Sequence, residues 1–226
     1  MGYSKKDAIA KLNRERREAK AAKRRKVAVR NRIVRFLIVC EGTKTEKNYF
    51  EAFVMNRQSI VREETIEGVG QATTKLVERT LEIKRDLEKK RQLDFDQVWV
   101  VFDKDDFEDF NNAINLTEKL GFKTAWSNES FELWYYLHFE HSDAALGRKD
   151  YIVKLRDAIR RHNGYEEYWY EKGDADFYHI LATIGNEQLA KDRARKLSEQ
   201  YTDQNYAAHN PCTKVHLLIE ELEKYQ

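Results

Sequence analysis

The sequence has few of the residues that cross-link or rigidify a chain. Its 226 residues include two cysteines, Cys40 and Cys212, and a single proline, Pro211. Two cysteines form neither a disulfide framework nor a metal cage. This scarcity favours a protein of a reducing compartment and excludes the class of disulfide-rich secreted domains.

Long hydrophobic runs are also lacking. Apolar runs are no longer than Phe36–Cys40, whereas a membrane-spanning helix needs about 18 apolar residues or more. The N-terminus is strongly charged and has no apolar segment of the kind found in secretory signals. We therefore expect a cytoplasmic protein that does not enter a membrane.

Charged residues are abundant, and their signs are unevenly distributed. Charged side chains make up 35% of the chain and its net charge is +2. Residues 1–35 contain 14 basic and 3 acidic side chains, a net charge of +11, which leaves a net charge of −9 for residues 36–226. A basic arm on an acidic body suggests a polyanionic partner such as nucleic acid.

The basic arm, residues 1–32, has the composition of a helix but too few apolar residues for a core-facing stripe. It is expected to be helical or flexible. A solubilising charged tail would have the same composition, so nucleic-acid contact is one of two interpretations. The candidate contact residues are Arg14, Arg17, Lys23, Arg24, Arg25 and Lys26.

Beyond the arm, β-branched apolar runs alternate with amphipathic segments. Hydrophobic residues make up 41% of the chain, enough for a core. The pattern predicts strands at 33–40, 59–66, 97–102 and 122–126, with helices at 48–54, 74–91 and 107–120. Such alternation is typical of an α/β fold whose mainly parallel sheet is flanked by helices. We assign this core to residues 33–140.

Residues 141–226 are expected to form a mostly helical C-terminal portion packed on the core. Its predicted helices are 150–163, 176–201 and 213–225. The first two are separated by an aromatic-rich connector, residues 164–173. These aromatic rings could stack on bases, but packing in the core or at a protein interface is the interpretation that we favour.

Acidic side chains follow two of the predicted strands. Glu41 follows the first strand, and Asp103, Asp105 and Asp106 follow the third. Ligands of parallel sheets collect at the carboxyl ends of the strands. Converging carboxylates repel one another unless a cation neutralises them, and oxygen donors without His or Cys favour Mg²⁺ or Mn²⁺. Capping of the next helix is the alternative role for the aspartates.

These motifs resemble a known signature. Val39-Cys-Glu-Gly-Thr-Lys-Thr-Glu46 and Val100-Val-Phe-Asp-Lys-Asp-Asp106 are similar to the Toprim pattern of topoisomerases, primases and some nucleases. The resemblance to the RloB-like family is closer and extends over residues 33–222. The segments that carry it are 41–50, 102–107, 127–134, 137–139 and 210–216.

The resemblance implies a Toprim-like core that transfers phosphoryl groups with Mg²⁺ or Mn²⁺. It implies that Glu41 is an acid/base or a metal ligand, that Asp103 and Asp105 are catalytic metal ligands, and that Asp106 is an accessory ligand. The expected activity is cleavage of RNA, for example tRNA, or of DNA in anti-phage or abortive-infection defence. RloB-like proteins are associated with ABC-type ATPases, so a sensor or interaction subunit without turnover is the alternative.

Further polar residues lie where they could reach the same edge of the sheet. For Glu132, Asn128, Asn210 and His216 the alternatives are helix capping or a place in the core, and for Lys172 an ordinary surface position. Of these, Glu132 could complete a metal site near the start of its helix. The accessory candidates are Lys44, Glu46, Asn128, Glu132, Lys172, Asn210 and His216.

Overall fold

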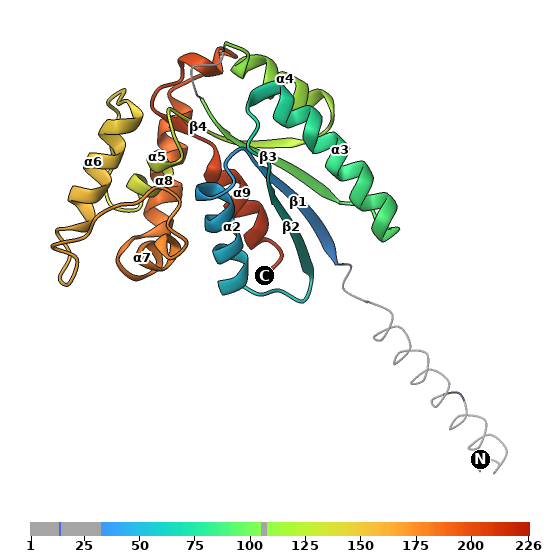
Figure 1. Cartoon of the computed structure of the whole chain (residues 1–226), viewed down its shortest axis with the longest axis horizontal. Helices are drawn as coiled ribbons and strands as arrows, with labels where there is room; N and C mark the ends of the chain where they lie inside the picture. Colours follow the sequence, from blue (N-terminus) through green and yellow to red (C-terminus); the bar gives the residue numbers. More distant parts are fainter. Residues whose placement is uncertain (1–13, 15–32, 105–107) are drawn as a thin grey trace, which may run out of the picture. The chain divides into compact units, whose positions relative to one another are not determined.

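Five strands form one sheet in the order β2-β1-β3-β4-β5 (Figure 1). Strands β1 to β4 are parallel, and β5 pairs antiparallel with β4. The computed structural model describes Arg14, residues 33–104 and residues 108–226. The strands are β1 Val34–Cys40, β2 Arg62–Gly68, β3 Gln97–Asp103, β4 Lys123–Asn128 and β5 Cys212–Thr213.

The central strands are apolar throughout because both faces of the sheet are covered. Phe36 and Ile38 of β1 belong to one core cluster, whereas Leu37 and Val39 belong to the other. Successive side chains of a strand point to opposite faces, so a strand buried on both sides needs a continuous apolar run. The edge strand β2 is instead rich in charged residues, which discourages pairing with another chain.

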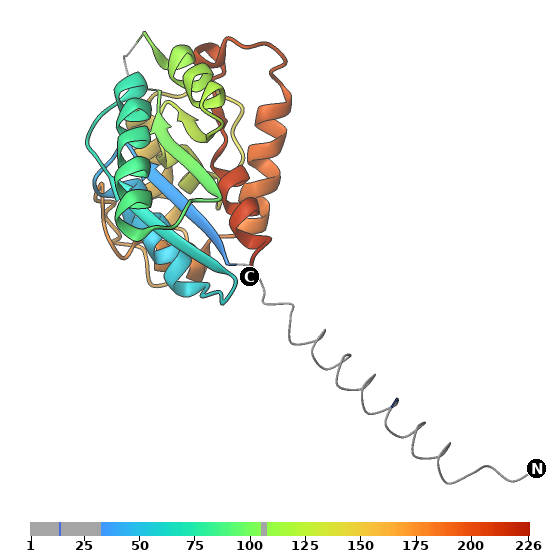
Figure 2. The ribbon, with the colours of Figure 1, turned by 90° about the vertical axis from the view of Figure 1, so that its right-hand side faces the viewer.

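Helices cover both faces of the sheet. The cluster that contains Leu37 includes residues of α3 (Thr73–Arg91) and α4 (Phe110–Lys119). Figure 2 shows α3 on one side of the sheet and α8 and α9 on the other. The remaining helices contribute to the cluster that contains Phe36: α2 Thr45–Asn56, α5 Glu132–Leu137, α6 Arg148–Ile159, α7 Phe177–Ile184, α8 Glu187–Glu199 and α9 Val215–Glu223.

The predicted α/β class with a helical C-terminal part is confirmed, with three local corrections. The helix predicted over 176–201 is two helices, because Asn186 caps α8 by accepting a hydrogen bond from the backbone N–H of Leu189 at 2.9 Å. The helix predicted from residue 213 starts at Val215, since Cys212 and Thr213 pair with β4. The strand predicted over 59–66 lies at 62–68.

Two groups of predictions fall outside this description. The arm residues Arg17, Lys23, Arg24, Arg25 and Lys26 lie outside the described residues, as do the predicted ligands Asp105 and Asp106. Arg14 is helical and exposed. No helix among the described residues is long and apolar enough to cross a membrane.

Candidate functional site

Glu41 and Asp103 meet at the carboxyl edge of the sheet, where the neighbouring strands β1 and β3 end. The backbone N–H of Glu41 donates to the carbonyl of Val101 at 2.8 Å, which continues the β1–β3 pairing by one residue. The carboxylate of Glu41 accepts a hydrogen bond from the backbone N–H of Asp103 at 3.2 Å. The sheet thus fixes the position of both acidic residues relative to each other.

Two further carboxylates, Glu46 and Glu132, come from the first turns of helices α2 and α5. Their residues are buried, with 4% and 0% of the surface exposed. Glu46 lies directly over Gly42, where a Cβ would approach its Oε2 to 1.9 Å. Only glycine therefore leaves room for Glu46 in this position. The hydroxyl of Tyr170, from the connector, donates to Oε1 of Glu132 at 2.9 Å.

Three members of the acidic cluster, which comprises Glu41, Glu46, Asp103 and Glu132, have incomplete hydrogen bonding. Within the described part of the chain, one buried oxygen of each of three carboxylates has no hydrogen-bond partner: Oε2 of Glu46, Oδ1 of Asp103 and Oε2 of Glu132. Burying a charged oxygen without a hydrogen-bond partner destabilises the folded state several times more than burying one that has a partner. Three such oxygens in one cluster are free to contact a ligand such as a cation.

Burial and mutual repulsion affect the protonation of the acidic cluster. Burial raises the pKa of Asp103 well above its ordinary value of 3.8, and the neighbouring carboxylates of Glu46 and Glu132 raise it further. Arg148 opposes this shift, with Nη2 at 3.9 Å from Oδ2 of Asp103. Burial also raises the pKa of Glu46, although its own backbone N–H and Lys172 act in the opposite direction.

The donor set fits a hard divalent cation. All four side chains of the acidic cluster offer carboxylate oxygens, the ligands that Mg²⁺ and Mn²⁺ prefer. Among the described residues, no group of three or more His, Cys, Asp or Glu side chains is arranged to hold a metal ion. Mg²⁺ is commonly held by one or two carboxylates, with water and phosphate oxygens completing its shell. The carboxylate oxygens without hydrogen-bond partners are therefore enough for a site in which one or two carboxylates hold Mg²⁺.

Two of the accessory lysines lie beside the acidic cluster. Lys44 and Lys172 line a pocket of about 320 Å³ together with Gly42, Thr43, Thr45 and Glu46. Lys172 comes from the connector and lies close enough to Glu46 to lower the pKa of its carboxyl. Both lysines are exposed.

The other three accessory candidates have no described contact with the acidic cluster. Asn128 ends β4 directly after Ser127, the register partner of Asp103, and its amide donates to the carbonyl of Ala207. The amide of Asn210 donates to the carboxylate of Glu129. His216 is buried in α9, and burial lowers its pKa to about 4.

Sequence reasoning missed two residues of this site. Arg148, at the start of α6, approaches Asp103, and Tyr170 binds Glu132. Nothing in the sequence distinguishes Arg148 from other surface arginines. Tyr170 carries a faint signal, because a buried tyrosine commonly finds a partner for its hydroxyl and the connector is rich in aromatic residues.

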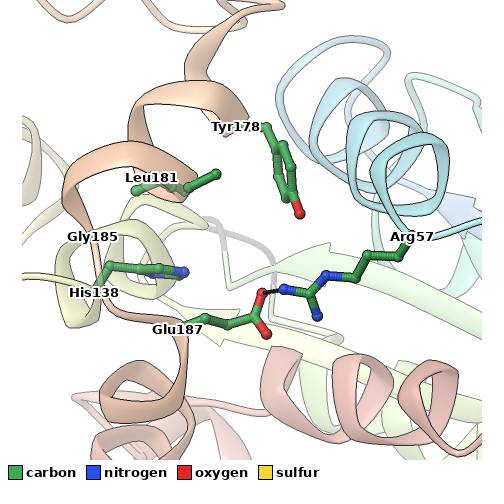
Figure 3. A pocket seen from close by; sticks show the side chains of 7 residues that line it. Arg57, His138, Tyr178, Leu181, Gly185 and Glu187 are labelled. Carbon is green, nitrogen blue, oxygen red and sulfur yellow. Dashed lines mark hydrogen bonds and ion pairs between the residues drawn. The ribbon is translucent and has the colours of Figure 1, made fainter. Parts of the chain in front are cut away.

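A second polar pocket, of about 160 Å³, lies between α2, α5, α7 and α8 (Figure 3). Arg57 binds Glu187 at 2.8 Å on one side of it, and the imidazole of His138 points into it from α5. Nδ1 of His138 lies 3.0 Å from the carbonyl of Trp134, and burial lowers the pKa of His138 to about 4. His138 is thus a neutral histidine packed in the core.

Comparison with known proteins gives one match. The family model described as RloB-like protein matches residues 36–222. Searches of curated proteins and of solved structures gave no significant match.

Proposed function

The chain belongs to the RloB-like family, and we propose that its acidic cluster is the catalytic centre of a metal-dependent phosphodiesterase that cleaves RNA or DNA. The observation that carries this proposal is the set of three buried carboxylate oxygens without partners on Glu46, Asp103 and Glu132. A structural role would favour paired charges, since leaving a charge buried and unpaired is strongly destabilising. A catalytic centre retains such groups because they serve the reaction.

We propose that one or two carboxylates without hydrogen-bond partners hold the cation together with Asp105. Glu46, Asp103 and Glu132 supply orphaned oxygens, and Asp105 follows Asp103 by two residues in the Toprim-type arrangement that we propose for this core. A bound Mg²⁺ or Mn²⁺ would supply charge stabilisation for a phosphate and would lower the pKa of water. Tyr170 holds Glu132 in place, as hydrogen bonds from outside a metal site commonly do.

Glu41 is suited to proton transfer. Its backbone is fixed on both sides, because its N–H bonds to Val101 and its carbonyl accepts from the N–H of Gly70 at 2.8 Å. The backbone N–H of Asp103 holds one carboxylate oxygen. The carboxylate is half-buried, so a proton can pass between it and solvent or substrate. We assign to Glu41 the role of general acid and base.

The biological setting is proposed from family membership alone. We propose that the activity serves anti-phage or abortive-infection defence and that an ABC-type ATPase controls it. RNA is the favoured substrate, and the basic arm is the proposed contact with its phosphates.

Cleavage assays on the full chain test the proposal directly. Total tRNA, other RNA, single-stranded DNA and double-stranded DNA are incubated with Mg²⁺ or Mn²⁺ and with EDTA. We expect cleavage that requires metal and that is lost in Glu41→Gln. The matched control is Asp94→Asn, because Asp94 is an exposed acid before β3, at the opposite edge of the sheet.

Either departure from this result is informative. Equal loss in Glu41→Gln and Asp94→Asn would indicate general charge effects and contradict the assignment of Glu41. A folded wild-type protein that binds Mg²⁺ but cleaves nothing would contradict intrinsic activity. It would favour the sensor or ATPase-bound subunit instead.

A further inference from the structure

The pocket between α2 and the connector is the clearest unassigned cavity next to the acidic cluster. Its lining combines the first turn of α2 with two lysines, Lys44 and Lys172. Neither lysine forms an ion pair with another described residue, whereas Lys47, later in α2, pairs with Glu51 at 3.6 Å. Two uncommitted ammonium groups beside a cluster of carboxylates require a separate explanation.

The connector is anchored on both sides of Lys172. Before it, the Tyr170 hydroxyl donates to Glu132 at 2.9 Å. After it, the carbonyl of Gly173 accepts from the side-chain amide of Asn48 at 3.0 Å. Gly173 has a φ of 82° and lies so close to Lys44 that a Cβ there would be 2.9 Å from the Lys44 Cβ. The backbone next to Lys172 therefore packs against the base of Lys44, and both lysines line one pocket.

The first turn of α2 adds a further preference for anions. Lys44 is the N-cap of α2 and its side chain makes no capping hydrogen bond. Backbone N–H groups at a helix start carry partial positive charge and bind phosphate groups. Glu46, in the same turn, is 4% exposed, lines the pocket and has one oxygen without a partner. An anion alone would be repelled by Glu46, whereas a phosphate whose other oxygens contact a cation would not.

We propose that this pocket is a phosphate subsite, in which Lys44, Lys172 and the start of α2 bind a phosphate of the substrate strand next to the acidic cluster. This role rests on the proposed phosphodiesterase function. The subsite extends the catalytic centre beyond the acids of the core, because Lys172 comes from the connector. The pocket volume of about 320 Å³ is at the lower end of small-molecule sites, about 300–1,000 Å³.

Binding of a short fluorescent oligouridylate by the full chain in Ca²⁺, in place of Mg²⁺ or Mn²⁺, tests the subsite, because Ca²⁺ also takes carboxylate and phosphate oxygens as ligands. Each lysine that neutralises a phosphate of a single strand contributes about 0.7 to the slope of log K against log salt concentration. We expect Lys172→Ala to reduce this slope by about 0.7 and to weaken binding about 10-fold at low salt. Lys172→Arg keeps the charge and should restore the slope.

Two controls make the result specific. Lys90→Ala removes an exposed lysine from the end of α3 and should leave the slope unchanged. Glu46→Gln should tighten binding in EDTA, since it removes a repelling carboxylate. Competition with adenosine monophosphate distinguishes the phosphate of a strand from that of a free nucleotide. Weaker binding of the oligouridylate or of the nucleotide in Lys172→Ala supports the subsite.

The outcomes separate the subsite from the catalytic proposal. Unchanged slopes in both Lys172→Ala and Lys44→Ala, or an equal loss in Lys90→Ala, would overturn the subsite even if the wild-type protein cleaves RNA. A reduced slope in a protein that cleaves nothing would support the subsite and contradict the phosphodiesterase.

Discussion

Helix α2 connects two groups of buried charges that are built in opposite ways. At its start, Glu46 belongs to the acidic cluster and retains an oxygen without a partner. Just beyond its end, Arg57 pairs with Glu187 at 2.8 Å and with Glu223 at 2.9 Å. Lys191 completes this second group by pairing with Glu223 at 2.8 Å.

The two groups differ in charge balance, and the second is also more exposed, with 28% of the Arg57 side chain accessible. The second group, which we call the paired network, has two cations and two carboxylates, which come from the residue after α2, from α8 and from α9. Such pairing holds α2, α8 and α9 together. The acidic cluster has four carboxylates, and the cations described beside it are Arg148, Lys172 and Lys44. The comparison supports the proposal that the paired network serves stability and that the acidic cluster is retained for catalysis.

The largest expected effect is on activity. Asp103→Asn keeps the shape of the side chain but removes a proposed metal ligand. Loss of a partner outside the metal shell commonly costs 10- to 100-fold, so loss of a ligand should reduce cleavage by at least about 100-fold. The melting temperature should not fall, because a carboxylate repelled by its neighbours is removed. A large fall would show that Asp103 is structural.

The paired network should give the converse result. Arg57→Met leaves Glu187 and Glu223 with a single cation, and the free energy of unfolding should fall by about 2 kcal/mol, less than for a fully buried pair. Urea denaturation measures this change, and cleavage by the folded variant should persist. Arg79→Met, which breaks an exposed pair with Glu82, should cost less than about 1 kcal/mol. Equal losses of unfolding free energy in Arg57→Met and Arg79→Met would show that the paired network stabilises the fold no more than an exposed ion pair does.

A smaller effect is expected from Tyr170→Phe, which deletes only the hydrogen bond to Glu132. If Glu132 binds the cation, the Kd for Mn²⁺ should rise about 10-fold because the carboxylate is no longer oriented. Electron paramagnetic resonance of free Mn²⁺ measures this affinity. An unchanged Kd together with a lower melting temperature would make Tyr170 a packing residue.

The smallest effect is expected in the pH dependence of stability without metal. The folded state raises the pKa of Asp103 above 3.8, so it binds more protons than the unfolded state. Stability from this group is therefore complete below pH 3.8 and is lost as the pH rises through the folded pKa. The free energy of unfolding, measured by urea denaturation, should fall less with rising pH in Asp103→Asn than in the wild-type protein. Parallel curves would contradict the raised pKa.

The sheet could be predicted from the sequence because its signal is local. Phe36–Cys40 and Val98–Phe102 are continuous apolar runs, which strands buried on both faces require. Strand β5 could not be predicted in this way. It has two residues, and its pairing depends on Thr213 meeting Ser127 across the edge of β4.

The same contrast applies to the candidate site. The proximity of Glu41 and Asp103 follows from strand ends alone, and the structure places them in contact. The burial of Glu46 and Glu132 depends on the packing of α2 and α5, which the sequence alone does not show. Arg148 and Tyr170 could not be found, because their contacts depend on the path of the C-terminal portion over the core.

The pairing of β5 with β4 has a consequence for the order of folding. The hydroxyls of Ser127 and Thr213 lie 2.8 Å apart and are separated by 86 residues. Ribosomes add about 5–20 residues per second, so roughly 4–17 s pass between the synthesis of these two strands. If β1 to β4 pair as they emerge, the free edge of β4 is exposed during that interval. An unpaired edge is a template for association with other chains, so this interval is the stage at which the nascent protein most needs protection by a chaperone.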